Sequence, residues 1–118
     1  MYGLPKNFDG SILEGATLEL IGFAQYHVDL HFDNKVSITI FSSFIHQKHE
    51  DSTSIIVKVP VSESNLMLLL GRRTVRVSGD DDGTLILEFD NGHKLCCLDD
   101  SRQYESYTIR CSGGDIVV

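Results

Sequence analysis

The sequence contains no tryptophan, only two prolines and no long hydrophobic run. Its longest uninterrupted apolar stretch is LMLLL at residues 66–70, whereas a helix needs roughly 20 apolar residues to cross a bilayer. The opening residues, MYGLPKNFDG, lack the cationic segment, apolar stretch and cleavage site of a secretory signal. We therefore expect a cytoplasmic protein with no membrane partner.

Basic side chains are also scarce. In 118 residues, 10 Lys and Arg stand against 17 Asp and Glu, which gives a formal net charge of −7. Proteins that bind nucleic acid usually carry a basic stripe that displaces counterions, so we expect no nucleic-acid partner. The acidic excess is uneven, because residues 78–105 hold eight acids and two bases. A chain of this length and ordinary composition is expected to form a single domain, residues 1–118.

Motifs of catalysis and of cofactor binding are missing. The three cysteines include the adjacent pair Cys96 and Cys97 but no Cys-x-x-Cys spacing, so we expect reduced thiols with a packing role. There is no Gly-x-Ser-x-Gly, and the aspartates at 80–82 lack the twelve-residue ligand pattern of an EF-hand. We therefore expect no catalytic residues, no cofactor and no enzymatic activity.

The histidines come closest to a metal-binding pattern. His27, Asp29 and His31 alternate onto one face of an expected strand, and His46 and His49 follow them along the chain. Same-face neighbours on a strand lie roughly 6.5–7 Å apart, a long reach for two side chains that must share one ion. We expect Asp29 and His31 to pair with polar residues of the next strand instead, and we predict no metal site.

Two nearly identical pentapeptides, LHFDN at residues 30–34 and LEFDN at residues 87–91, each predict a hairpin. The segments around them alternate apolar and polar residues with the period of two that is typical of a strand. A loop of three residues lets all apolar positions of each hairpin share one face, with Phe32 opposite Val36 in the first copy. On the other face this register pairs polar residues, Asp29 with Thr39 and His31 with Ser37.

The turn of the second hairpin has two alternatives. A three-residue loop pairs Glu88 with Lys94 and gives Gly92 the left-handed conformation that the third loop position requires. A two-residue turn instead places Lys94 opposite Phe89. We favour the three-residue loop because it aligns the charged pair. In the first hairpin Lys35 holds the corresponding position, where a residue other than glycine costs about 1 kcal/mol.

Similar segments precede the two hairpins, GATLEL at residues 15–20 and GRRTVRV at residues 71–77. Each half of the chain therefore predicts a three-stranded meander, at about residues 15–41 and about residues 71–98. Three strands with one apolar face need a partner surface, so two meanders related by a pseudo-twofold axis would cover each other. The predicted fold class is α+β, mainly antiparallel β, arranged as a rolled sheet or a small sandwich. Both a barrel and a sandwich satisfy the alternation.

The remaining segments predict one short helix, further strands and two loops. Ser62 is a suitable N-cap for a helix at about residues 63–70 that ends at Gly71. Its predicted apolar stripe consists of Leu66, Met67, Leu69 and Leu70. Additional strands are expected at residues 55–59, 104–109 and 116–118. Two polar segments without apolar periodicity are expected to protrude, at residues 43–54 and 78–84.

The acidic stretch and its tyrosine form the predicted partner-binding surface, since loops between strands often carry binding function. Tyr104 adds an aromatic side chain beside the carboxylates. Alternation places Tyr104 and Tyr107 on opposite faces of their strand, which allows Tyr107 to join the core. The candidate partner-binding residues are Asp80, Asp81, Asp82, Asp99, Asp100, Tyr104 and Glu105.

Three segments carry a resemblance to a known family: MYGLPKNFDGSILEG, YHVDLHFDNKVSITI and GTLILEFDNGHKLCCLDDSRQYESYTI. In them the sequence resembles a family of small uncharacterised bacterial proteins with immunity-protein-like character. The resemblance covers most of the chain and implies a bacterial, cytoplasmic origin. It brings no catalytic residues with it.

Two hypotheses of function follow. The first is a non-enzymatic protein-binding module, an immunity protein that neutralises a cationic toxin such as a basic nuclease through its acidic surface. The second is a self-associating structural or regulatory domain, a homodimer that pairs through edge strands or the apolar residues 66–70. A metal-binding or small-ligand-binding protein that uses the histidine-bearing strand is a third alternative.

Overall fold

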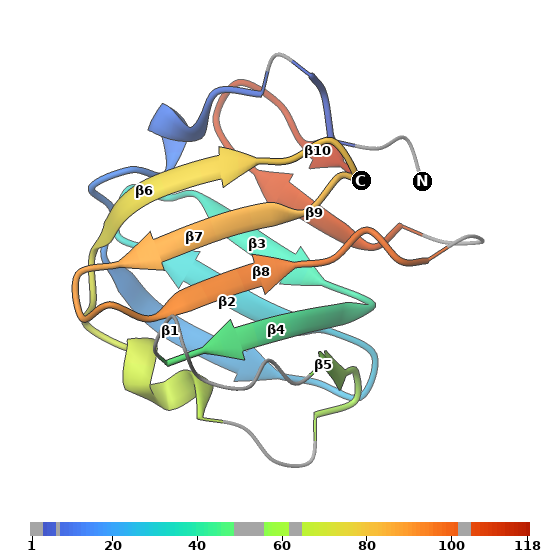
Figure 1. Ribbon diagram of the computed structural model, residues 1–118, viewed down its shortest axis with the longest axis horizontal. Coiled ribbons are helices and arrows are strands. Elements are labelled where there is room, and N and C mark those ends of the chain that lie inside the picture. Colours follow the sequence, from blue (N-terminus) through green and yellow to red (C-terminus); the bar gives the residue numbers. More distant parts are fainter. Residues whose placement is uncertain (1–3, 7, 49–55, 62–64, 102–104) are drawn as a thin grey trace.

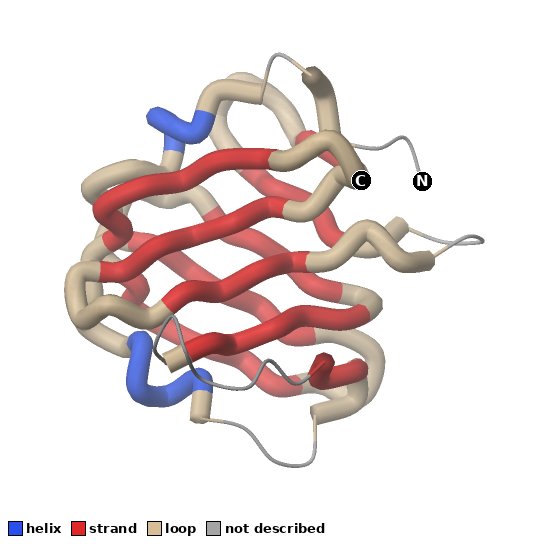
Figure 2. The backbone as a smooth tube through the Cα atoms, in the orientation of Figure 1, coloured by secondary structure: helices blue, strands red, loops and turns tan. Residues whose placement is uncertain are grey.

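In the computed structural model, residues 4–6, 8–48, 56–61, 65–101 and 105–118 are described. Within these residues the chain forms two five-stranded antiparallel sheets. Figure 1 shows the sheets as two layers that lie face to face, and Figure 2 shows how little of the backbone is helical. No helix among the described residues is long and apolar enough to cross a membrane.

The first sheet contains the first hairpin and the end of the chain. Its strands lie in the order β1-β2-β3-β9-β10, with the bounds β1 Leu18–Phe23, β2 Val28–Phe32, β3 Ser37–Ile40, β9 Tyr107–Arg110 and β10 Ile116–Val117. The second sheet contains the second hairpin. Its strands lie in the order β5-β4-β8-β7-β6, with the bounds β5 Ile56–Lys58, β4 Ser43–Gln47, β8 Lys94–Cys97, β7 Leu85–Phe89 and β6 Thr74–Gly79.

Both predicted hairpins are confirmed in register. In the first, Asp29 lies opposite Thr39 and His31 opposite Ser37. In the second, Glu88 lies opposite Lys94, so the alternative two-residue turn is wrong. The third loop residue of each hairpin has a positive φ, 69° at Lys35 and 85° at Gly92. Each sheet thus holds one meander, β1-β2-β3 or β6-β7-β8, and a pseudo-twofold relation between them stays a prediction.

The segments that precede the two meanders pair with each other. Thr17 and Arg73 form an antiparallel bridge between the sheets, and the backbone N–H of Leu18 donates to the carbonyl of Arg72 at 3.0 Å. The strand predicted after each glycine is present in both halves, and it begins three residues after Gly15 and Gly71, at Leu18 and Thr74.

The segment predicted to be an α-helix at residues 63–70 contains a 3₁₀ helix instead. The structure has a 3₁₀ helix, η2 (Leu66–Leu69), and residues 62–64 lie outside the described part of the chain. Leu66 and Leu69 are buried, whereas Met67 and Leu70 are exposed. A repeat of three residues per turn puts residues 66 and 69 on one face, while the predicted stripe assumed the α-helical period. A second 3₁₀ helix, η1 (Gly10–Ile12), begins after Asp9, whose carboxylate accepts the N–H of Ser11.

Both predicted loops are shorter than expected, because strands occupy part of each. Residues 43–47 form β4, which lies between β5 and β8 and buries Phe44 completely; residues 49–55 lie outside the described part of the chain. The segment at 78–84 is mostly a tight turn, because β6 continues to Gly79 and Thr84 is already buried. The residues of β4 do not alternate cleanly between apolar and polar, so alternation alone does not identify this strand from the sequence.

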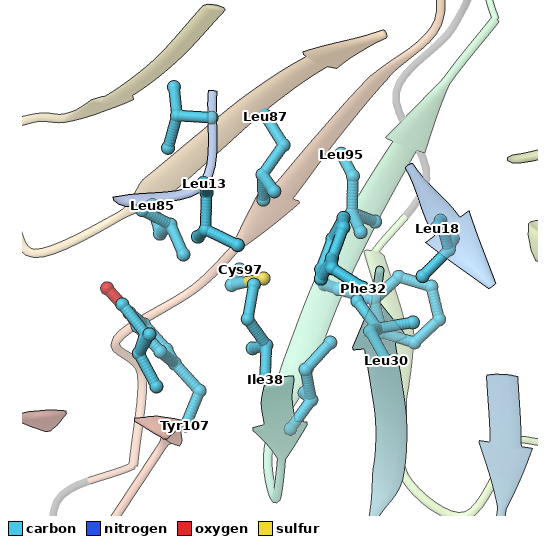
Figure 3. Packing of buried hydrophobic residues seen from close by; sticks show 14 of the residues in the cluster. Leu13, Leu18, Leu30, Phe32, Ile38, Leu85, Leu87, Leu95, Cys97 and Tyr107 are labelled. Carbon is cyan, nitrogen blue, oxygen red and sulfur yellow. The ribbon is translucent and has the colours of Figure 1, made fainter. Parts of the chain in front are cut away.

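The core fills the space between the sheets. Figure 3 shows Leu30 and Ile38 of the first sheet close to Leu95 and Cys97 of the second, and all four side chains are fully buried. Leu13, which follows η1, is also fully buried and joins this cluster. Each such leucine or isoleucine contributes about 1.5–3 kcal/mol through burial, so the face-to-face packing is the main source of stability.

Candidate functional site

The predicted acidic residues come from two separate segments that meet at one end of the two sheets. The turn between β6 and β7 lies beside the connection from β8 to β9 (Figure 1). The hydroxyl of Tyr107, on β9, donates to the carbonyl of Gly83 at 2.7 Å. Asp99 packs on the same glycine, where an added Cβ would lie 2.6 Å from Asp99 Oδ2. We call the carboxylates of these two segments the acidic end: Asp80, Asp81, Asp82, Asp99, Asp100 and Glu105.

The three aspartates of the β6–β7 turn are exposed and partly fixed by the backbone. Asp80 Oδ1 accepts the N–H groups of Asp82 and Thr84, each at 3.2 Å, and Asp82 Oδ1 accepts that of Thr84 at 3.1 Å. A hydrogen bond between their carboxyl groups raises the pKa of Asp80 and lowers the pKa of Asp82. Asp81 is exposed between them. The turn thus presents negative charge in a defined conformation.

The acids of the β8–β9 connection are held by hydroxyl groups. Ser106 donates to Asp99 at 3.1 Å, Thr108 donates to Glu105 at 2.5 Å, and Ser42 donates to Asp100. Asp100 is exposed, whereas Asp99 and Glu105 are half-buried. Asp99 and Glu105 therefore position this connection more than they extend into solvent. The predicted contact residue Tyr104 lies outside the described residues.

A hollow of about 470 Å³ lies next to the exposed aspartates. The N-terminal segment forms one wall, and Leu4 packs so closely on Gly79 that a Cβ there would lie 2.2 Å from its side chain. The hollow combines apolar walls with two carboxylates and one amine, and is lined by Leu4, Pro5, Lys6, Phe8, Gly79, Asp80 and Asp81. The sequence has no local signal for this hollow, because nothing in it relates residues 4–6 and 8 to residues 79–81.

The predicted contact between Asp29 and Thr39 is present, and His27, just before β2, lies against the same carboxylate. Thr39 donates to Asp29 at 2.7 Å, and His27 Nε2 lies 3.2 Å from the other oxygen of Asp29. His31 is exposed. His49 lies outside the described part of the chain, and in the rest no group of three or more His, Cys, Asp or Glu side chains is arranged for a metal ion.

His46 lies elsewhere than expected. It belongs to β4 in the second sheet, not beside His27, and its Nε2 lies 3.1 Å from Nδ1 of His93. The two ring centroids are 5.2 Å apart and the rings are tilted by 49°. Burial, followed by the charges of His93 and Lys48, lowers the pKa of His46 from 6.5 to about 4. This ring is therefore neutral at pH 7. The sequence does not predict this pair, because the segment that contains His46 lacks the apolar periodicity of a strand.

The cysteines have packing roles. Cys97 is fully buried, as predicted, and burial raises the pKa of its thiol. Burial also raises the pKa of Cys96. Cys111 is half-buried and donates to the carbonyl of Gly114 at 3.0 Å. Because thiolates are the reactive form, the raised pKa values of Cys96 and Cys97 argue against a nucleophilic role for either residue.

A second surface is apolar and lies at the β1 edge of the first sheet. Gly71, just after η2, donates its N–H to the carbonyl of Leu18 in β1 at 2.8 Å, which places η2 beside this edge strand. Near this contact, one side chain of β1, two of η2 and that of the residue after η2 are 42–60% exposed. We call them the apolar edge: Leu20, Met67, Leu68 and Leu70.

Comparison with known proteins gives a family and no function. No curated protein and no solved structure matches the chain. One family model matches residues 11–118, which is nearly the whole chain. That range includes both meanders and every residue of the acidic end, but not residues 4–6 and 8, which line the neighbouring hollow. This protein belongs to DUF6188, a family of unknown function.

Proposed function

We propose that this protein is a non-enzymatic, cytoplasmic protein-binding module whose acidic end captures a cationic protein. The observation that carries the proposal is the meeting of carboxylates from two segments, fixed by the bond from Tyr107 to Gly83 and by the contact of Asp99 with the same glycine. A concentrated negative surface speeds the encounter with a positively charged partner and rejects partners of like charge.

The partner class that we propose is a cationic toxin such as a basic nuclease, with this protein as its immunity protein. A net charge of −7 and a surface rich in carboxylates resemble the charge that a nuclease meets on nucleic acid. Such a role needs complementarity and charge but no catalytic group. The toxin would be neutralised by occupation of its basic substrate-binding surface.

Within the acidic end, some residues would contact the partner and another would hold the turn in place. Asp80, Asp81, Asp82 and Asp100 are exposed and would contact the partner, while the half-buried Asp99 holds the β6–β7 turn in place. The adjoining hollow would accept the aliphatic stem of a lysine or arginine against its apolar wall, with the cationic head beside Asp80 and Asp81. This combination of apolar contact and charge distinguishes a specific site from diffuse acidity.

The test is a pull-down with tagged protein from cells of the source organism, repeated at low and high salt. Asp81→Lys with Asp100→Lys reverses two exposed charges of the acidic end. Glu19→Lys with Asp90→Lys makes the same net change at exposed positions away from it. We expect a basic polypeptide that the first variant loses and the second retains. Equal capture by both variants would show that the acidic end does not bind the partner.

The apolar edge favours a second candidate, a homodimer. Leu20, Met67, Leu68 and Leu70 lie on or beside an edge strand, where a second chain can extend the sheet. Light scattering tests this candidate with Leu20→Glu and Leu68→Glu, and with Val75→Glu on β6 as an exposed control. A wild-type monomer at high concentration would reject it.

A further inference from the structure

The two imidazoles of His46 and His93 converge between neighbouring strands of the second sheet. His46 lies in β4 opposite Leu95 of β8, and His93 comes two residues before Leu95, on the same face of the sheet. His93 also closes the β7–β8 hairpin, where its carbonyl accepts the N–H of Phe89 at 2.9 Å. Both ligand atoms are therefore carried by paired backbone, which limits their relative movement.

The separation of the two nitrogens suits a shared metal ion. Two imidazole nitrogens that bind one ion at about 2.0–2.1 Å lie roughly 2.9–3.4 Å apart for bond angles between a right angle and the tetrahedral angle. The distance from His46 Nε2 to His93 Nδ1 is 3.1 Å. In the metal-free protein the two nitrogens share a hydrogen bond, so one of them carries the proton. For a metal ion to bind both nitrogens, that imidazole must take its other tautomer, with the proton on its second ring nitrogen.

We propose that His46 and His93 form a two-histidine site for a divalent transition-metal ion, with water completing its coordination. Neutral imidazole is a suitable ligand for Ni²⁺, Cu²⁺ and Zn²⁺, whereas Mg²⁺ and Ca²⁺ require oxygen ligands. Both residues are half-buried, so the ion would remain in contact with solvent and would exchange. The site is distinct from the acidic end and does not depend on the proposed partner.

The affinity should be modest. Two protein ligands supply about half the binding free energy of a four-ligand zinc site, which corresponds to a Kd of roughly 1–200 µM. The charge of Lys48 acts on His46 and opposes a cation. Lys94, which follows His93, lies opposite Glu88 in register, and the Glu88 carboxylate is 3.7 Å from Arg76 Nε. The net charge of −7 favours cations in general.

Isothermal titration of tag-free, full-length protein with Ni²⁺ tests the site. Cys111→Ser is used as background, because this half-exposed thiol can bind nickel itself. His46→Gln and His93→Asn place an amide near the position of each ligand nitrogen, which keeps hydrogen bonding but removes a good metal ligand. We expect one ion per chain in the background protein, at least tenfold weaker binding in either variant, and unchanged binding in His27→Gln.

Two outcomes would overturn the proposal. One is absence of binding at about 1 mM Ni²⁺, which would leave a hydrogen-bonded pair only. The other is unchanged affinity in His46→Gln or loss in His27→Gln, either of which would place the ion elsewhere. If a variant fails to fold, the NMR spectrum of the wild-type protein shows where the ion binds. Paramagnetic Ni²⁺ should broaden the ring signals of His46 and His93 first, and broadening that begins at His27 or His31 would reject the site.

Discussion

The hydroxyl of Tyr107 donates a hydrogen bond of 2.7 Å to the carbonyl of Gly83. Tyr107 lies in the first sheet and Gly83 in the β6–β7 turn of the second. Tyr107 is fully buried, and burial, followed by the charges of Cys97 and Asp99, raises the pKa of its hydroxyl. The hydroxyl therefore stays protonated as a donor and ties the two sheets together beneath the acidic end.

Tyr107→Phe should destabilise the protein by about 1–3 kcal/mol, because the buried Gly83 carbonyl loses its donor. Urea unfolding followed by circular dichroism measures the change. Tyr26→Phe is the matched control, since Tyr26 is 73% exposed and should cost almost nothing. Equal stability of the two variants would mean that the bond does not hold the turn.

Two glycine substitutions separate backbone strain from contact. Gly92→Ala and Gly83→Ala both place a side chain at positive φ, 85° and 89°. At Gly92 the new Cβ has nothing within 4 Å, so we expect a loss of about 1–2 kcal/mol from strain alone. At Gly83 the Cβ meets Asp99, so the loss should be larger. Thermal melts of both variants show which one loses more stability. A larger loss in Gly92→Ala than in Gly83→Ala would mean that Asp99 does not pack against the turn.

Lys35→Gly should stabilise the first hairpin by about 0.5–1 kcal/mol. Lys35 has a φ of 69°, a conformation that glycine adopts without steric cost, although glycine also loses more entropy on folding. Lys35→Ala removes the same charge and keeps the strain, so no comparable gain is expected from it. Chemical denaturation of the three proteins gives the comparison. A gain in both variants would assign the effect to charge instead.

Stability should fall as the pH drops from about 6.5 towards about 4, partly because of His46. Its pKa is about 4 in the folded protein and 6.5 in the absence of burial, so the unfolded chain binds more protons in this interval and unfolding is favoured there. Above about pH 6.5 the imidazole of His46 is neutral in both the folded and the unfolded chain, so its burial costs no stability by protonation. The effect is reduced by the solvent contact of this half-buried ring. Metal-free His46→Gln, compared with wild type across pH, should show a smaller slope; an identical slope would contradict the assignment.

The sequence predicted the hairpins well because their information is local. The loop length and the alternation around residues 30–34 and 87–91 determine the register within each hairpin, and the structure reproduces that register. The positive φ at Lys35 was expected for the same reason. Neither prediction depends on residues that are distant in the chain.

The errors involve contacts between distant segments. Ser43–Gln47 lacks clean alternation, which predicts a loop, yet it forms β4 by pairing with β8, about 50 residues later. The apolar run at 66–70 was assigned α-helical geometry, but its packing beside β1 is satisfied by a single 3₁₀ turn. Local propensity is a weak guide where tertiary pairing decides.

The acidic residues were recognised as a group from charge alone, but their arrangement was not predictable. Only the folded chain brings Gly83 against Asp99 and Tyr107. The same holds for His46 and His93, which are 47 positions apart in the sequence although His46 Nε2 lies 3.1 Å from His93 Nδ1. Spatial proximity of this kind carries no signal in one sequence.

The most direct test of the proposed function is an NMR titration of ¹⁵N-labelled protein with the captured basic polypeptide, or with unlabelled protein if none is captured. We expect the largest changes in backbone amide chemical shift in residues 80–83 and 99–101, and we expect them to weaken at high salt. Changes centred instead on Leu20, Met67, Leu68 and Leu70, and insensitive to salt, would contradict the proposed function and assign the binding surface to the apolar edge.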